Sequence, residues 1–219
     1  MPRILERVLP HFDAEGEGIA KELELTDWPE QAERMAIAAD DVSVARSGLD
    51  LVTGFAALVP NGGVLVVRSD DAAAGAALVA AICGRYPVAS GTLKVAGLVL
   101  PTRAAAVRAR SALVPLRASR SPADDVRRAL APGVELLGLC DLDAVGEARE
   151  RSGLARALGR ARNGIPHGRG KDAPPTPVTI VASCSPSADV SDLVGDADVV
   201  EVTIDAPVAA PPDLLAGVS

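Results

Sequence analysis

The pattern of apolar and polar positions changes character near residue 36. Upstream of this point, short apolar groups at helical spacing are interrupted by prolines and acidic residues. Downstream, two apolar stretches, 37–45 and 50–59, flank a turn at Ser47-Gly48 and predict a pair of strands. The β-branched run 63–68 is typical of a strand buried at the centre of a sheet.

A helix is predicted directly after that buried strand. Residues 69–84 are rich in alanine, Ser69 or Asp70 can cap the N-terminus, and Gly84 can close the helix. Strand, tight turn and helix in this order form a unit whose helix N-terminus often receives a phosphate group.

The remainder alternates between short strands and helices, so the sequence predicts an α/β fold. We expect a strand at 91–97, a short helix and a strand within 100–116, a helical region over about 121–163, a loop at 164–177, strands at 177–184 and 197–205, and a short helix between them. The chain then divides into an acidic N-terminal arm (1–35), an α/β domain (36–205) and a disordered tail (206–219).

Composition removes several classes of function. A net charge of -7 and only 2% aromatic residues argue against a nucleic-acid binder. Three separated cysteines without a CxxC pair, and only two histidines, predict no metal site and no catalytic residue. The chain contains no run of 18 apolar residues and its start does not resemble a secretory signal, so we expect a cytoplasmic protein, with a peripheral place at the inner face of the membrane left open.

Charge is unevenly distributed. Residues 1–33 hold nine carboxylates against three basic residues, which suits either a solvated packing arm or an arm that docks on a partner. A stretch without any acidic residue contains five arginines, and it predicts either a solvated face or a basic patch that binds an acidic partner: Arg103, Arg108, Arg110, Arg117 and Arg120.

The order of elements resembles the ATPase domain of ABC transporters over about residues 36–205. AIAADDVSVARSGLDLVTGFAALVPNGGVLVV is similar to the antiparallel strands that open that domain and the phosphate-loop strand. VRARSALVPL is similar to the approach to the Q-loop, and VTIVASCSPSADVSDLVGDADVVEV to the H-loop strand and the elements after it. The resemblance implies a P-loop NTPase-like mixed sheet with N-terminal antiparallel strands and a reduced helical subdomain.

The chemistry departs from that family at the phosphate loop, where a glycine-rich loop should end in Lys-Ser/Thr. The corresponding stretch runs from Arg68 to Ala76, and its degenerate positions are Ser69, Asp70, Asp71, Ala74, Gly75 and Ala76. Ala74 stands about where the lysine should be, and Gly75 or Ala76 where the hydroxyl should be. Asp70 and Asp71 should satisfy the helix N-terminus themselves and repel a phosphate. Arg68 precedes the loop and is expected to face elsewhere.

Other positions also lack the residues that bind or hydrolyse ATP in that family. The adenine-stacking position is Arg46, the Q-loop position is Leu116, and the H-loop position is Cys184. We expect no apolar strand ending in Asp-Glu before residue 177, so the Walker B residues lack counterparts and one strand with its helix is predicted to be missing. The signature motif remains at most as Ser152-Gly153.

The leading hypothesis is therefore a non-catalytic, ABC-ATPase-like interaction module that needs no cofactor and partners a membrane permease or an active ABC subunit. One alternative is an ABC subunit with altered motifs that binds Mg-ATP, with Arg46 and backbone N–H groups, within a heteromeric pair. Another is an unrelated α/β enzyme. A homodimer stays open.

Overall fold

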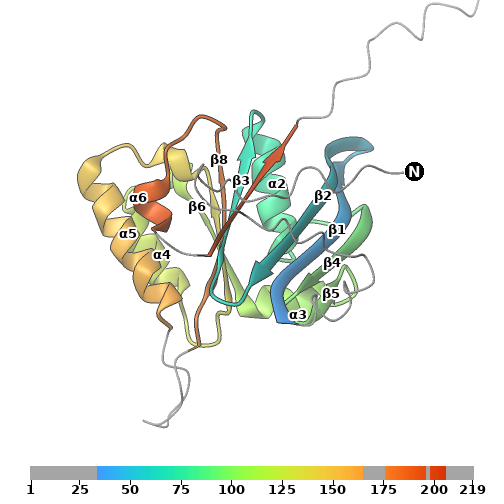
Figure 1. The fold of residues 1–219 in the computed structure, drawn as a ribbon, viewed down its shortest axis with the longest axis horizontal. Coiled ribbons are helices and arrows are strands. Elements are labelled where there is room, and N and C mark those ends of the chain that lie inside the picture. The colour runs from blue at the N-terminus through green and yellow to red at the C-terminus, as the bar shows by residue number, and fades with distance from the viewer. Residues whose placement is uncertain (1–33, 165–175, 196–197, 206–219) are drawn as a thin grey trace, which may run out of the picture.

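The computed structural model describes residues 34–164, 176–195 and 198–205. A four-stranded antiparallel sheet and a five-stranded parallel sheet lie on either side of helix α2 (Ala72–Ile82), and further helices cover the other face of the parallel sheet (Figure 1). Residues 1–33 of the predicted arm, the predicted tail and residues 165–175 of the predicted loop lie outside the described residues.

The antiparallel sheet contains the predicted strand pair. Its order is β2-β1-β4-β5, and the bounds are β1 (Met35–Arg46), β2 (Leu49–Pro60), β4 (Ser90–Val95) and β5 (Leu98–Leu100). The turn between β1 and β2 lies at Ser47-Gly48, as predicted, and both residues have positive φ angles of 51° and 80°. Two positive φ angles are what a two-residue hairpin turn requires, because its twist then matches that of the strands.

The parallel sheet has the order β6-β7-β8-β3-β9, with all neighbours parallel. Its strands are β3 (Val64–Ser69), β6 (Ser111–Pro115), β7 (Leu136–Cys140), β8 (Thr179–Cys184) and β9 (Val199–Ile204). β3, β6, β8 and β9 confirm strands expected from the sequence. The central strands are buried on both faces, which accounts for their continuous apolar runs.

Strand β7 corrects the sequence analysis. The stretch 121–163 was expected to be helical throughout, and a strand with its helix was expected to be missing. Instead, Leu136–Cys140 is a fully buried strand between β6 and β8, followed by the 15-residue helix α5 (Ala148–Arg162). Leucine favours helices, and a short apolar run cannot be assigned to strand or helix by periodicity. The expectation that the Walker B aspartate lacks a counterpart is also corrected in part, because Asp141 directly follows this strand, with Leu142 in place of the glutamate.

The helices divide between the two faces of the parallel sheet. α2 packs between the sheets, whereas α4 (Pro122–Ala129), α5 and α6 (Ser191–Val194) cover the opposite face, and α3 (Ala104–Arg110) leads into β6 (Figure 1). Only α4 and the short turn η2 (Leu116–Ala118) lie between β6 and the loop that leads to β7. Ser152-Gly153 lies inside α5, after β7 rather than before it, so its assignment as a signature remnant was wrong.

This arrangement places a topological switch point at the carboxyl edge of the parallel sheet. The chain leaves β3 toward α2 on one face, and it leaves the neighbouring strand β8 toward α6 on the other. In open α/β sheets, ligands bind at the point where adjacent connections diverge in this way. The candidate site is therefore the edge formed by the ends of β3, β8 and β7.

Candidate functional site

The connection from β3 to α2 is very short. β3 ends at Ser69 and α2 begins at Ala72, so only Asp70 and Asp71 lie between them. Asp71 is the N-cap, which corrects the prediction of Ser69 or Asp70: its Oδ1 accepts from the backbone N–H of Ala73 at 2.8 Å. The hydroxyl oxygen of buried Ser69 accepts a hydrogen bond from the backbone N–H of Asp71 at 3.1 Å. The groups that would hold an anion at this helix end are thus partly committed to the chain's own side chains.

The residues aligned with the family's lysine and hydroxyl lie on α2 itself. Ala74 and Gly75 are buried, and Ala76 is half-buried. A Cβ atom on Gly75 would lie 3.1 Å from Cβ of Ser183, so this glycine lets α2 approach β8 closely. These positions pack the helix against the sheet and do not form a loop around a ligand.

Arg68 ends on the opposite side of β3 from α2, where it bridges three elements. Its Nε and Nη2 atoms donate to the carboxylate of Glu201 on β9 at 3.0 and 3.2 Å, and its Nη1 donates to the carbonyls of Ala188 at 2.9 Å and Pro186 at 3.1 Å. The hydrogen bond to Glu201 raises the pKa of Arg68. The cation nearest the phosphate-loop position is therefore committed to contacts within the protein.

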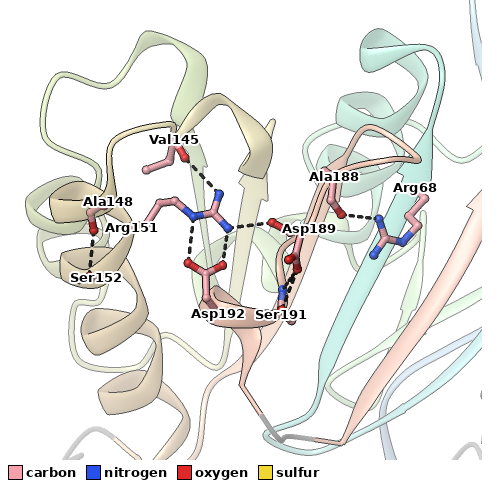
Figure 2. Close-up of polar contacts among 9 residues, drawn as sticks. All are labelled: Arg68, Val145, Ala148, Arg151, Ser152, Ala188, Asp189, Ser191 and Asp192. Atoms are coloured by element: carbon pink, nitrogen blue, oxygen red, sulfur yellow. Dashed lines mark hydrogen bonds and ion pairs between the residues drawn. The ribbon is translucent and has the colours of Figure 1, made fainter. Parts of the chain in front are cut away.

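The segment from Ser185 to Val190 joins β8 to α6, and we call it the β8–α6 loop. Figure 2 shows it held between two arginines, Arg68 on one side and Arg151 of α5 on the other. Arg151 donates to both carboxylate oxygens of Asp192, to the carbonyl of Asp189 at 2.8 Å and to that of Val145 at 3.2 Å. The ion pair raises the pKa of Arg151 and lowers that of Asp192.

The end of β7 adds Asp141 and Asp143, a spaced pair of carboxylates that the sequence pattern assigns to helix capping rather than to a site. Asp141 adopts a left-handed conformation, its N–H donates to Oγ of Ser183 at 3.2 Å, and its carboxylate pairs with Arg117 at 3.2 Å. Ser185 donates to Asp143 at 2.8 Å. The signal was present as Asp-Leu-Asp directly after an apolar run, but it has meaning only once that run is known to be a strand.

The remaining aligned positions do not converge on a ligand. Arg46 is exposed at the tip of the β1–β2 hairpin, and Leu116 is buried in η2 after β6. Cys184 is buried at the end of β8, and burial raises its pKa, which disfavours the nucleophilic thiolate. Within the described residues, we find no cluster of groups that could hold a metal ion.

The five arginines proposed as a basic patch do not form one surface. Arg108 and Arg110 belong to α3 and Arg103 is the residue before it, all ahead of the amino end of β6, whereas Arg117 and Arg120 follow its carboxyl end. The five residues of β6 separate the two groups by roughly 16 Å. Two members are also paired, Arg110 with Glu135 at 3.7 Å and Arg117 with Asp141. The two groups of arginines thus flank a strand, and binding of an acidic partner by these residues stays a prediction.

Replacing Asp71 with alanine should destabilise the protein by about 1 kcal/mol, because the helix loses its N-cap. Urea unfolding of the Asp71→Ala variant measures this loss. Asp70→Ala is the matched control: Asp70 is the adjacent carboxylate, it is exposed, and its removal should leave the unfolding midpoint unchanged. Equal effects of the two substitutions would show that Asp71 does not act as a cap.

Comparison with known proteins identifies the fold. No family model and no curated protein matches the sequence. Among solved structures, CbiO1 from Clostridium perfringens, part of the ABC transporter complex CbiONQ, is similar with a TM-score of 0.54 and 11% identity, over 78% of this chain and 87% of that one. A bacterial Atm1-family ABC exporter with ATP bound is similar with a TM-score of 0.53 and 12% identity, over 79% of this chain and 38% of that one.

These similarities confirm the fold class expected from the sequence, a mixed α/β fold like that of P-loop NTPases and of ABC transporter ATP-binding subunits in particular. Among the described residues, no helix is both long and apolar enough to cross a membrane.

Proposed function

We propose that this chain is a non-catalytic interaction module with the scaffold of an ABC transporter ATP-binding domain. It would act at the inner face of a membrane as a partner of a permease or of an active ATP-binding subunit. The similarity to a subunit of the CbiONQ transporter complex supports this assignment.

One observation carries the proposal: two residues connect β3 to α2, and both are aspartates. Phosphate loops bind nucleotides by wrapping several backbone N–H groups around the phosphates, with a lysine to neutralise them. Two residues are too few to form such a wrap. A phosphate at this helix end would also meet two carboxylates, at a cost of roughly 4 kcal/mol for each pair of charges at 4 Å.

The neighbouring side chains support the same interpretation. Phosphoryl transfer depends on cations and Mg²⁺ ligands that are free to contact the nucleotide. Here Arg68 pairs with Glu201, Arg117 with Asp141 and Arg151 with Asp192. Three guanidinium groups at this edge thus bind carboxylates and loop carbonyls of the protein itself, which stabilises the scaffold.

Mg-ATP should not raise the melting temperature of the full-length chain, nor should the chain hydrolyse ATP above a blank preparation. A ligand at a hundred times its Kd would stabilise the native state by about 2.7 kcal/mol, a shift that thermal unfolding readily detects. An upward shift with Mg-ATP would favour the alternative of an ATP-binding subunit within a heteromeric pair.

The Asp70→Asn/Asp71→Asn variant separates charge from geometry, because asparagine keeps the cap but removes both negative charges. If loop length is the barrier, this variant should bind Mg-ATP no better than the wild type. A gain of binding would mean that repulsion alone excludes the nucleotide and that a phosphate site persists beneath it.

A further inference from the structure

The amino edge of the parallel sheet, opposite the candidate site, contains a hollow of about 530 Å³. Its wall is mixed: Met35, Ala36, Val95, Leu136 and Pro177 supply apolar surface, and Asn61, Thr176, Thr179 and Glu135 supply polar groups. Backbone contacts fix this wall, since the N–H of Ala96 donates to the carbonyl of Ala36 at 2.8 Å. A hollow of this volume falls in the range of pockets that hold small ligands and can accept one large aromatic ring.

Beside this hollow lies an exposed basic helix. Glu135 in the wall pairs with Arg110, the last residue of α3, at 3.7 Å between Oε2 and Nη1. Arg108 of the same helix and Arg103, the residue before it, are exposed, and neither has an ion pair among the described residues. The seven residues of α3 span about 10 Å, and the helix meets the wall of the hollow through its last residue, Arg110. We call α3 and the hollow together the basal surface.

The N-terminal segment enters the fold at this place. Met35 and Ala36 begin β1 and are themselves part of the wall. Trp28, the only tryptophan of the chain, precedes Met35 by seven residues, a span of up to about 24 Å when extended. Residues 13–33 contain eight carboxylates and a single lysine. The sequence of this segment therefore offers one large aromatic ring and a dense negative charge, which complement a partly apolar hollow and the exposed Arg103 and Arg108.

We propose that the acidic segment 13–33 binds the basal surface of its own chain, with Trp28 in the hollow and its carboxylates along α3. Burial of the indole ring of Trp28 provides the hydrophobic part of the binding free energy. Attraction between the carboxylates of the segment and Arg103 and Arg108 sets the orientation of the segment. Intramolecular attachment favours this occupant, because a tethered segment has an effective concentration in the millimolar range. The segment then covers the basal surface against an acidic loop of a partner protein.

Trp28 fluorescence in the full-length chain tests the proposal directly. Trp28 should be shielded from acrylamide relative to free N-acetyltryptophanamide. In the Arg103→Glu/Arg108→Glu variant, two attractions become repulsions, so the docking constant should fall about fivefold or more and quenching should increase. High salt should act in the same direction in the wild type.

The matched control is Arg156→Glu/Arg160→Glu, which reverses two exposed charges on α5, across the parallel sheet from the antiparallel sheet. This variant should leave Trp28 shielded. Full accessibility of Trp28 in the wild type would overturn the proposal, as would equal responses of the two variants. Shielding that disappears on dilution would assign the segment to a second copy of the chain and would also overturn it.

Discussion

Between about pH 9 and pH 11, the free energy of unfolding should fall by about 4 kcal/mol because of two buried thiols. Burial raises the pKa of Cys83 from 9.0 to about 12 and that of Cys140 from 9.0 to about 11. In the unfolded chain, both thiols lose their protons from about pH 9, whereas in the native state they keep them. The unfolded state then binds fewer protons, so stability decreases as the pH rises.

The packing around Cys83 explains why its thiolate is disfavoured. Its Sγ atom contacts β7 so closely that a Cβ atom on Gly138 would lie 2.6 Å away. Its hydrogen bond is a long one, 3.8 Å from Sγ to the carbonyl of Ala112, and a carbonyl cannot stabilise a negative charge. Alkaline pH therefore acts at the contact between α2 and the parallel sheet, on which the candidate site is built.

Urea unfolding under reducing conditions, repeated from about pH 8 to pH 11, measures this dependence. The Cys83→Ala/Cys140→Ala variant serves as control. Its cavities lower stability at every pH, but its stability should change much less above pH 9. The comparison of slopes separates titration from packing. Parallel curves for the wild type and the variant would show that these thiols do not cause the alkaline loss.

The sequence predicted the scaffold well where an element has a distinctive signal. The β1–β2 hairpin followed from a Ser-Gly turn between apolar stretches, and β3 and β8 followed from β-branched runs. β7 was missed because Leu-Leu-Gly-Leu-Cys contains no β-branched residue, and only pairing with β6 and β8 makes it a strand. Tertiary context decided its conformation, as local propensity could not.

The candidate site was predictable only in part, for the same reason. Asp70 and Asp71 could be located because they follow a recognisable strand, and the cap formed by Asp71 follows from elementary helix chemistry. The contacts of Arg68 with Glu201, and of Arg151 with Asp192, join residues 133 and 41 positions apart. No local pattern encodes such pairs, since they depend on strand order. The five arginines of the predicted basic patch are close in sequence, but β6 lies between them, so they fall into two groups at opposite ends of that strand.

Replacing Arg68 with methionine should destabilise the protein by about 2 kcal/mol, because charge-assisted hydrogen bonds at a mostly buried guanidinium are lost. The side chain of Arg68 is 18% exposed and joins β3 to Glu201 and to the β8–α6 loop. Methionine keeps most of the apolar stem, so the loss measures the polar contacts. Urea unfolding gives the magnitude, and hydrogen exchange should show faster exchange at amides of the loop around Ala188.

Arg127→Met provides the matched control, since Arg127 forms an ion pair with Asp124 on the surface of α4 and its loss should not measurably change stability. The comparison also discriminates between roles for Arg68. A cation kept for a phosphate ligand is held at a cost to the fold, so its removal should leave stability unchanged or increase it. If Arg68 instead has a structural role, its replacement should lower stability clearly, whereas Arg127→Met should not. A double-mutant cycle should then show that substitutions at Arg68 and Glu201 are energetically coupled. In that case Arg68, the residue that precedes the phosphate-loop position, serves the scaffold.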